Sequence, residues 1–308
     1  MAMVQYGLWS NCSNKCDFCL LRERDYISEQ KQIDRLEFTI KNLDYVDWEN
    51  KFSHGISLLG GELYYCPSIN VQTKFLELID KIIEKILKVS PNPYCRYSTV
   101  TNGIYDPEFL FKVVDRFVDN GVFDKVDINF SYDLKYRFHS EESRLLCLEN
   151  LKKYNERYNT KVNVQMIVTQ YLIDEYNNKK IEFNDFQEKT LNGNNLNFLY
   201  PHAVRTGKVL SDFFFKRKDF IRFLCDLQIN YPIMFDNFIF SIYNSSKFKY
   251  SGYYHRLSDD VTQQPELEAD KVNMSSNCGH SMLYQCYSDC DKCMLCDIIE
   301  LGFLSNFA

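Results

Sequence analysis

The sequence predicts an α/β fold in which a partial (β/α)6 parallel barrel, residues 1–208, precedes a small cysteine-rich C-terminal domain, residues 209–308. Short β-like runs alternate with amphipathic helical patterns up to about residue 230, as in βα units around a parallel sheet. The chain of 308 residues is 45% hydrophobic, which is enough to fill a substantial core. Five cysteines then crowd into residues 278–296, which sets this part of the chain apart from the βα pattern.

Six segments have the composition and length of buried strands. In the fifth segment, Val162, Val164 and Met166 alternate with Asn163 and Gln165, so that one face is apolar. In chain order, the expected strands are residues 4–8, 56–59, 97–101, 126–130, 162–168 and 196–200.

Amphipathic helical patterns separate these strands. Between the second and third strands, apolar residues recur at helical spacing from Phe75 to Leu87, and Pro91 and Pro93 follow shortly after. We expect this helix to pack on the barrel or sheet. The other expected helices are residues 28–43, 108–120, 141–158 and 211–228.

Charge and composition narrow the partners and the compartment. The net charge of -6 disfavours a nucleic-acid partner, and the basic run Lys216-Arg217-Lys218 is typical of a solvated helix face. We expect no export signal, because residues 1–30 are too polar for one, and no apolar run approaches the roughly 20 residues that cross a bilayer. We therefore expect a cytoplasmic protein with no membrane partner, in which clustered cysteines bind metal rather than form disulfides.

The first cysteine group directly follows the first expected strand. Cys12, Cys16 and Cys19 lie in WSNCSNKCDFC with C-x3-C-x2-C spacing. Three thiolates this close can hold a cubane iron-sulfur cluster by three of its irons, whereas such clusters normally take four cysteines. The fourth iron is then open to another ligand. A zinc knuckle or three buried thiols are the other interpretations, but structural zinc takes four ligands and no further His or Cys follows within a few residues.

A glycine-rich turn follows the second expected strand. Gly60, Gly61 and Glu62 lie in the sequence ISLLGGEL. The carboxyl ends of the strands form the active-site face of a parallel barrel, so this turn and the cysteine triplet belong to one face. With Phe18 before the last cysteine, the two motifs resemble those of radical S-adenosylmethionine enzymes in order and spacing.

The resemblance implies a [4Fe-4S] cluster on the cysteine triplet, with S-adenosylmethionine bound to the open iron and cleaved reductively to a 5'-deoxyadenosyl radical. It also implies that Glu62 accepts a hydrogen bond from the methionine ammonium and that Phe18 lies near the adenine. Gly60 and Gly61 would let the backbone approach this ligand, since neither carries a Cβ.

Weaker matches to the same family follow the later strands. Asn102 lies in a Thr-Asn-Gly sequence that resembles the family's TNG turn. Ser131 begins a Ser-Tyr-Asp segment after the fourth strand that resembles one whose serine faces the cofactor ribose, while Asp133 is also consistent with a turn cap. Residues 200–207 resemble the segment that lines the adenine site. Arg144 is either a partner of the cofactor carboxylate or a surface helix residue.

A second cysteine group lies in the C-terminal domain, with the pattern C-x7-C-x3-C-x2-C-x2-C. It resembles the C-terminal extensions of the family called SPASM or twitch, and with fewer than seven cysteines it favours one auxiliary iron-sulfur cluster over two. The alternative is a four-cysteine zinc site that stabilises a small lobe. The group consists of Cys278, Cys286, Cys290, Cys293 and Cys296.

The resemblance predicts an oxidoreductase that abstracts hydrogen from a substrate carbon after cofactor cleavage. The first candidate substrate is a peptide or protein side chain, as in the family's maturases, and the second is a small molecule or a nucleoside. A flavodoxin or a ferredoxin would supply the electron. A different class stays open: a non-catalytic iron-sulfur electron carrier or redox sensor, which would need no carboxylate beside the cluster.

Overall fold

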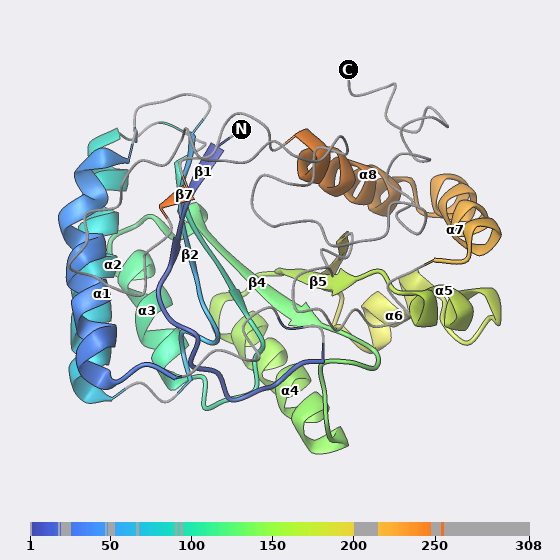
Figure 1. The fold of residues 1–308 in the computed structure, drawn as a ribbon, viewed down its shortest axis with the longest axis horizontal. Coiled ribbons are helices and arrows are strands. Elements are labelled where there is room, and N and C mark those ends of the chain that lie inside the picture. Colours follow the sequence, from blue (N-terminus) through green and yellow to red (C-terminus); the bar gives the residue numbers. More distant parts are fainter. Residues whose placement is uncertain are drawn as a thin grey trace.

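The computed structural model describes residues 2–17, 19, 26–46, 48, 53–65, 68–89, 92, 95–199, 215–247 and 254–255. They form a seven-stranded parallel sheet in the order β6-β5-β4-β3-β2-β1-β7 (Figure 1). Strands β1 to β6 stand in sequence order, which confirms the predicted α/β fold with a partial (β/α)6 barrel. The strands are β1 Ala2–Gly7, β2 Ser53–Leu59, β3 Arg96–Thr101, β4 Val126–Tyr132, β5 Asn163–Ile167, β6 Asn195–Leu199 and β7 Tyr254–His255.

Helices connect the strands, and α1, α2, α3 and α4 lie together along one side of the sheet (Figure 1). Side-chain caps fix two of their starts, because the Ser28 hydroxyl accepts the Lys31 N–H at α1 and the Ser140 hydroxyl accepts the Ser143 N–H at α4. The helices are α1 Glu29–Asn42, α2 Ile69–Val89, α3 Glu108–Asp119, α4 Glu141–Tyr158, α5 Gln170–Asn177, α6 Phe183–Lys189, α7 Arg217–Asn230 and α8 Pro232–Lys247, with short 3-10 turns η1 Leu43–Tyr45 and η2 Phe123–Lys125.

All six predicted strands are present, with ends shifted by a few residues. One of these shifts changes the description of the site. Strand β4 continues to Tyr132, because Ser131 and Tyr132 pair in register with Gln165 and Met166 of β5. The prediction that Ser131 follows the fourth strand is therefore wrong, and this serine lies within the strand.

The helices after β5 differ most from the prediction. Helix α7 begins at Arg217 and not at residue 211, because Phe215 stacks on Phe220 (centroids 4.3 Å apart) and the Lys216 N–H donates to Gln170 Oε1 (2.7 Å). The sequence pattern does not predict α5, α6 or α8. Helices α5 and α6 span only eight and seven residues, too few for a clear helical period, and the sequence of α8 is rich in aromatic, Ser and Asn residues.

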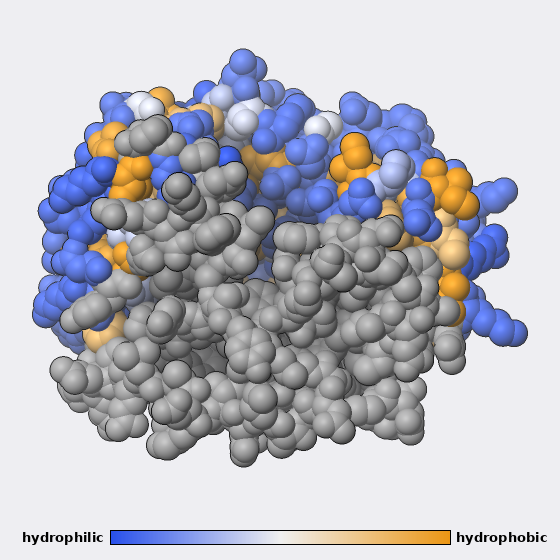
Figure 2. Space-filling model, turned by 90° about the horizontal axis from the view of Figure 1, so that it is seen from above, coloured by the Kyte–Doolittle hydropathy of each residue, from blue (hydrophilic) through white to orange (hydrophobic). Residues whose placement is uncertain are grey.

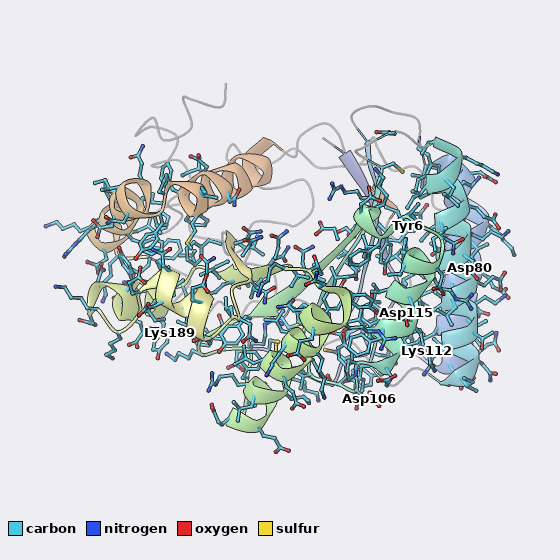
Figure 3. The ribbon with its side chains drawn as sticks, turned by 180° about the vertical axis from the view of Figure 1, so that it is seen from behind. Tyr6, Asp80, Asp106, Lys112, Asp115 and Lys189 are labelled. Atoms are coloured by element: carbon cyan, nitrogen blue, oxygen red, sulfur yellow. The ribbon has the colours of Figure 1, made fainter. Side chains whose placement is uncertain are left out.

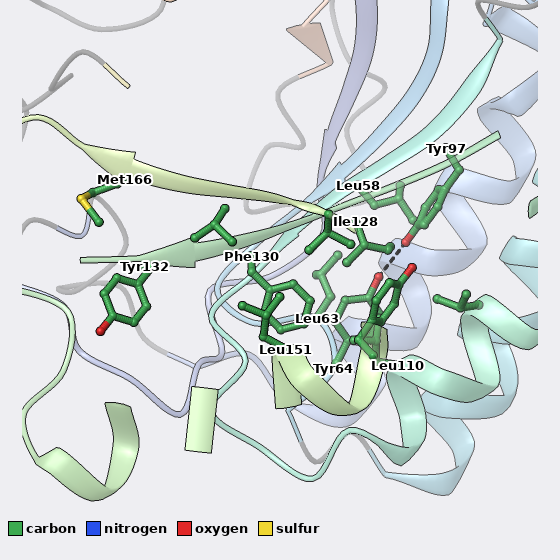
Figure 4. Packing of buried hydrophobic residues seen from close by; sticks show 14 of the residues in the cluster. Leu58, Leu63, Tyr64, Tyr97, Leu110, Ile128, Phe130, Tyr132, Leu151 and Met166 are labelled. Carbon is green, nitrogen blue, oxygen red and sulfur yellow. Dashed lines mark hydrogen bonds between the residues drawn. The ribbon is translucent and has the colours of Figure 1, made fainter. Parts of the chain in front are cut away.

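Side chains alternate between an apolar face of the sheet, against the helices, and a polar face on the other side. Leu58, Ile128 and Phe130 belong to the hydrophobic cluster between the sheet and helices α3 and α4 (Figure 4). Their strand neighbours Ser57 and Asn129 point away from the helices, since side chains alternate along a strand. Both are also buried, with exposed fractions of 4% and 5%.

Polar contacts join the turn after β2 to strand β3, and helix α3 to helix α4. Within the core, the buried hydroxyls of Tyr64 and Tyr97 hydrogen-bond to each other at 2.9 Å (Figure 4). On the outside, Asp115 of α3 accepts hydrogen bonds from Arg157 (2.8 Å) and Tyr158 (2.9 Å) of α4, and Figure 3 shows Asp115 on its helix. Exposed ion pairs stabilise a fold by at most about 1 kcal/mol, so apolar burial is the main source of stability here.

Helices α7 and α8 belong to the predicted C-terminal domain, yet they pack on the edge of the barrel sheet. Phe198 of β6 contacts Phe223 of α7 and Phe238 of α8, with ring centroids 6.1 Å apart in each pair. The predicted domain boundary near residue 208 lies outside the described residues and stays a prediction.

On the face that Figure 2 shows, the described residues are mostly hydrophilic, with hydrophobic patches between the polar areas. Among the exposed apolar side chains, Ile229 and Ile233 flank the turn between α7 and α8 and are 76% and 77% exposed. Within the described ranges, no helix combines the length and apolar character that spanning a membrane requires.

Candidate functional site

The predicted site residues that the structure describes lie at the carboxyl ends of four neighbouring strands. The cysteine triplet follows β1, the Gly-Gly-Glu turn follows β2, Asn102 follows β3, and Ser131 lies near the end of β4. Because the strands are parallel and adjacent, these ends meet at one edge of the sheet.

The segments after β1 and β2 are joined backbone to backbone. The Gly61 N–H donates to the Trp9 carbonyl (2.7 Å), and the Glu62 N–H donates to the Asn11 carbonyl (2.8 Å). A Cβ at Gly60 would lie 2.8 Å from the Trp9 oxygen, and one at Gly61 would lie 2.3 Å from the Asn11 oxygen. These glycines are therefore required by the neighbouring loop itself, a reason that the sequence interpretation, which invoked a ligand, did not contain.

The Asn11 side chain closes the segment that carries the cysteines. Its Oδ1 accepts the Ile27 N–H (2.9 Å), and its Nδ2 donates to the Ile27 carbonyl (3.1 Å). Within the segment, the Cys19 N–H donates to the Cys16 carbonyl (3.0 Å), and the Ser13 hydroxyl donates to the Ile104 carbonyl after β3 (3.1 Å). The cysteine segment is thus held both at its ends and against the next strand ends.

Glu62 is buried, with an exposed fraction of 1%, and its carboxylate accepts several hydrogen bonds. The donors are the Asn102 N–H (2.6 Å), the Thr101 hydroxyl (3.0 Å) and the Tyr64 N–H (3.3 Å). Burial raises the pKa of Glu62 to about 7, although these donors, led by the Asn102 N–H, oppose the rise. A carboxyl group with this pKa changes protonation near neutral pH.

Asn102 links this carboxylate to the first cysteine. While its backbone N–H binds Glu62, its Nδ2 donates to the Cys12 sulfur at 3.4 Å. Its Oδ1 accepts the Ile104 N–H (2.7 Å), which fixes the side chain. Asn102 was predicted to bind the cofactor, and in the structure its side chain contacts a cysteine of the triplet.

Two residues that the sequence reasoning missed contact the second cysteine. Asn14 Nδ2 donates to the Cys16 sulfur (3.2 Å) and to the Arg137 carbonyl (2.8 Å), and Arg137 Nη1 donates to the same sulfur (3.7 Å). Their positions in the sequence were the only indication of these contacts. Asn14 lies inside the cysteine motif, and Arg137 follows β4, whose carboxyl end lies at the same edge of the sheet.

The other candidates after β4 have structural partners. Asp133 is buried and accepts the backbone N–H groups of Lys135 and Tyr136, as expected of a turn cap, and burial raises its pKa to about 6. Arg144 donates to Glu141 (2.7 Å) and to the Tyr132 hydroxyl (3.2 Å), which supports the surface-helix interpretation. Ser131 is buried in β4.

The thiols of Cys12 and Cys16 are neutral in the metal-free chain. Burial raises the pKa of Cys12 to about 12 and also raises that of Cys16, which the nearby Arg137 guanidinium opposes. Metal binding would release protons from these thiols, and the N–H donors at Cys12 and Cys16 would then bind thiolates. Hydrogen bonds to sulfur are a usual feature around iron-sulfur clusters, so the residues present fit such a group.

In the described part of the chain, no three His, Cys, Asp or Glu side chains are grouped closely enough to hold a single metal ion. A cubane binds each cysteine through a different iron and so does not require the three sulfurs to meet at one ion. Several predicted site residues lie outside the described residues and stay predictions: Phe18, residues 200–207, Cys278, Cys286, Cys290, Cys293 and Cys296.

Comparison with known proteins gives matches by structure and none by sequence. No protein-family model and no curated protein matches the chain. Native anSMEcpe with bound AdoMet matches with 19% identity and a TM-score of 0.47 over 81% of this chain and 68% of that chain. Native anSMEcpe with bound AdoMet and Kp18Cys peptide matches with 18% identity and a TM-score of 0.48, over 81% of this chain and 67% of that chain. SuiB of Streptococcus suis matches with 18% identity and a TM-score of 0.28, over 69% of this chain and 54% of that chain. The chemistry inferred for this chain rests on its own residues.

Replacing Gly61 by alanine should destabilise the site edge, because the new Cβ would lie 2.5 Å from the Ser10 oxygen and still closer to that of Asn11. We expect Gly61→Ala to lower the free energy of unfolding by about 1–3 kcal/mol in urea titrations. The matched control is Gly7→Ala, since no atom of the described residues lies within 4 Å of a Cβ there, and its free energy of unfolding should stay within about 0.5 kcal/mol of the wild type. Equal stability of the two variants would contradict the close approach.

The buried Glu62 should make stability depend on pH. Its pKa of about 7 in the folded chain lies above the value of about 4.3 for an unfolded chain. Between these values the folded protein binds more protons, so the free energy of unfolding should fall as pH rises, by at most ~1.4 kcal/mol per pH unit.

The test is urea unfolding of the metal-free protein at pH 5, 6 and 7. Glu62→Gln should remove this part of the slope, whereas Glu84→Gln, which removes an exposed carboxylate of α2, is the control for the loss of one charge. Parallel curves for the wild type and Glu62→Gln would show that Glu62 does not titrate in this range.

Proposed function

We propose that the chain is a radical S-adenosylmethionine enzyme. One observation carries the proposal: a triplet of cysteines at the end of β1 is linked by Asn102 to the buried carboxylate of Glu62 at the end of β2. An electron carrier would need no such carboxylate. Cys12, Cys16 and Cys19 would hold a [4Fe-4S] cluster by three irons, which leaves one iron for the cofactor.

When bound, the cluster and S-adenosylmethionine supply a one-electron cleavage that yields methionine and a 5'-deoxyadenosyl radical. The chain's own residues supply the surroundings of that reaction. Glu62 would accept a hydrogen bond from the methionine ammonium, for which a charge-assisted bond in a buried site is well suited. Asn14, Asn102 and Arg137 would donate to the cysteine sulfurs.

For the substrate, we propose a peptide or protein side chain, with a small molecule or nucleoside as the alternative. The support is the second cysteine group, whose pattern resembles extensions that are common in peptide-modifying members of the family. In the proposed enzyme this group holds an auxiliary iron-sulfur cluster, and a flavodoxin or ferredoxin supplies the electron. The AdoMet and peptide of anSMEcpe belong to that protein.

Anaerobic reconstitution with iron and sulfide, followed by reduction in the presence of S-adenosylmethionine, tests the function. The wild type should release 5'-deoxyadenosine and methionine, measured by liquid chromatography. Cys16→Ala should reduce the product to background, because two cysteines cannot hold the cluster with one iron open. Cys225→Ala, a cysteine on α7 away from the site, is the control and should retain activity. A reduced wild-type cluster that releases no 5'-deoxyadenosine would favour the electron carrier.

The two cysteine groups should be separable by mutation. Cys293→Ala should lower the bound iron, because it removes a ligand of the auxiliary cluster, but should leave the release of 5'-deoxyadenosine unchanged. Iron and sulfide analysis with Mössbauer spectra checks the first expectation, and product analysis checks the second. If the wild type binds zinc and Cys293→Ala has the same iron content as the wild type, the proposal of an auxiliary iron-sulfur cluster is wrong.

A further inference from the structure

The segment after β4 places one arginine at the cysteine site. Asp133 accepts the Lys135 and Tyr136 N–H groups and so forms the turn that precedes Arg137. The Tyr136 carbonyl accepts the Asp17 N–H (3.0 Å), and the Arg137 carbonyl accepts Asn14 Nδ2 (2.8 Å). Backbone atoms on both sides of the Arg137 side chain are therefore attached to the cysteine segment.

The Arg137 side chain brings a positive charge to the second cysteine. Its Nη1 lies 3.7 Å from the Cys16 sulfur, although the two residues are 121 positions apart in the sequence. The same guanidinium acts electrostatically on Glu62 and Asp133, two buried carboxyl groups at this edge. Arg137 therefore offsets negative charge at the place where the proposed cluster would add more.

We propose that Arg137 is a positioning residue that raises the reduction potential of the cluster by donating to the Cys16 sulfur. This inference rests on the proposed function. In the reduction step one electron passes from a low-potential donor, a flavodoxin or ferredoxin in the cell, to the cluster, and no bond is made or broken. The added negative charge is stabilised by a cation that donates to a ligand sulfur, and hydrogen bonds to sulfur are one of the determinants of cluster potential.

The test is a redox titration of the anaerobically reconstituted full chain, with dithionite as reductant and the reduced cluster quantified by EPR. Arg137→Met removes the charge and the donor, and Arg137→Gln removes the charge but keeps an amide donor. Arg137→Lys restores the charge. Arg222→Met is the matched control, since Arg222 lies on α7 with its side chain 70% exposed.

At a given solution potential, Arg137→Met should lower the ratio of reduced to oxidised cluster about tenfold, which corresponds to about 59 mV for one electron. Arg137→Gln should shift the potential in the same direction by less, Arg137→Lys should restore most of it, and Arg222→Met should match the wild type.

Each other result overturns one of the two proposals. A wild-type potential in a cluster-containing Arg137→Met or Arg137→Gln protein refutes the role of Arg137 alone. The role of Arg137 is also refuted if Arg137→Met and Arg137→Gln bind no cluster, whether or not Arg137→Lys binds one. In that case a residue at this position is needed to form the cluster site and not to set the reduction potential. Failure of the wild type to bind a [4Fe-4S] cluster refutes the proposed function itself.

Discussion

Close contact between the backbones after β1 and β2 is the constraint on which the site depends. Gly60 and Gly61 lie so close to the carbonyls of Trp9 and Asn11 that a Cβ on either glycine would force these segments to shift. This contact sets where the cysteine segment leaves β1 and where Glu62 enters the edge of the sheet. Backbone hydrogen bonds hold the contact, from the Gly61 N–H to the Trp9 carbonyl and from the Glu62 N–H to the Asn11 carbonyl.

From that contact, hydrogen bonds extend across the edge to β3 and β4. Glu62 receives the Asn102 N–H, Asn102 reaches Cys12, and Asn14 connects Cys16 with the segment that contains Arg137. Each connection joins a different pair of strand ends, so the cysteines are placed by four strands and not by their own segment alone. Displacement of one strand end would be transmitted to the sulfurs.

Strong local patterns made much of the fold and the centre of the site predictable. Short β-like runs predicted the strands, and the cysteine triplet and the Gly-Gly-Glu turn were predicted to follow the first two of them. The extension of β4 to Tyr132 was missed because Ser131 is a poor strand signal, and its pairing with Gln165 depends on register. Arg137 has no local signature, because its contact with Cys16 exists only after the whole sheet has formed.

The polar face of the sheet has a chemical consequence. Ser57 and Asn129, on the side away from the helices, present hydroxyl and amide groups without formal charge. Such groups both give and accept protons in hydrogen bonds, and they impose no preference for cations or anions. Any preference for cations or anions at the strand ends therefore comes from ionisable side chains such as Glu62 and Arg137, and not from Ser57 or Asn129.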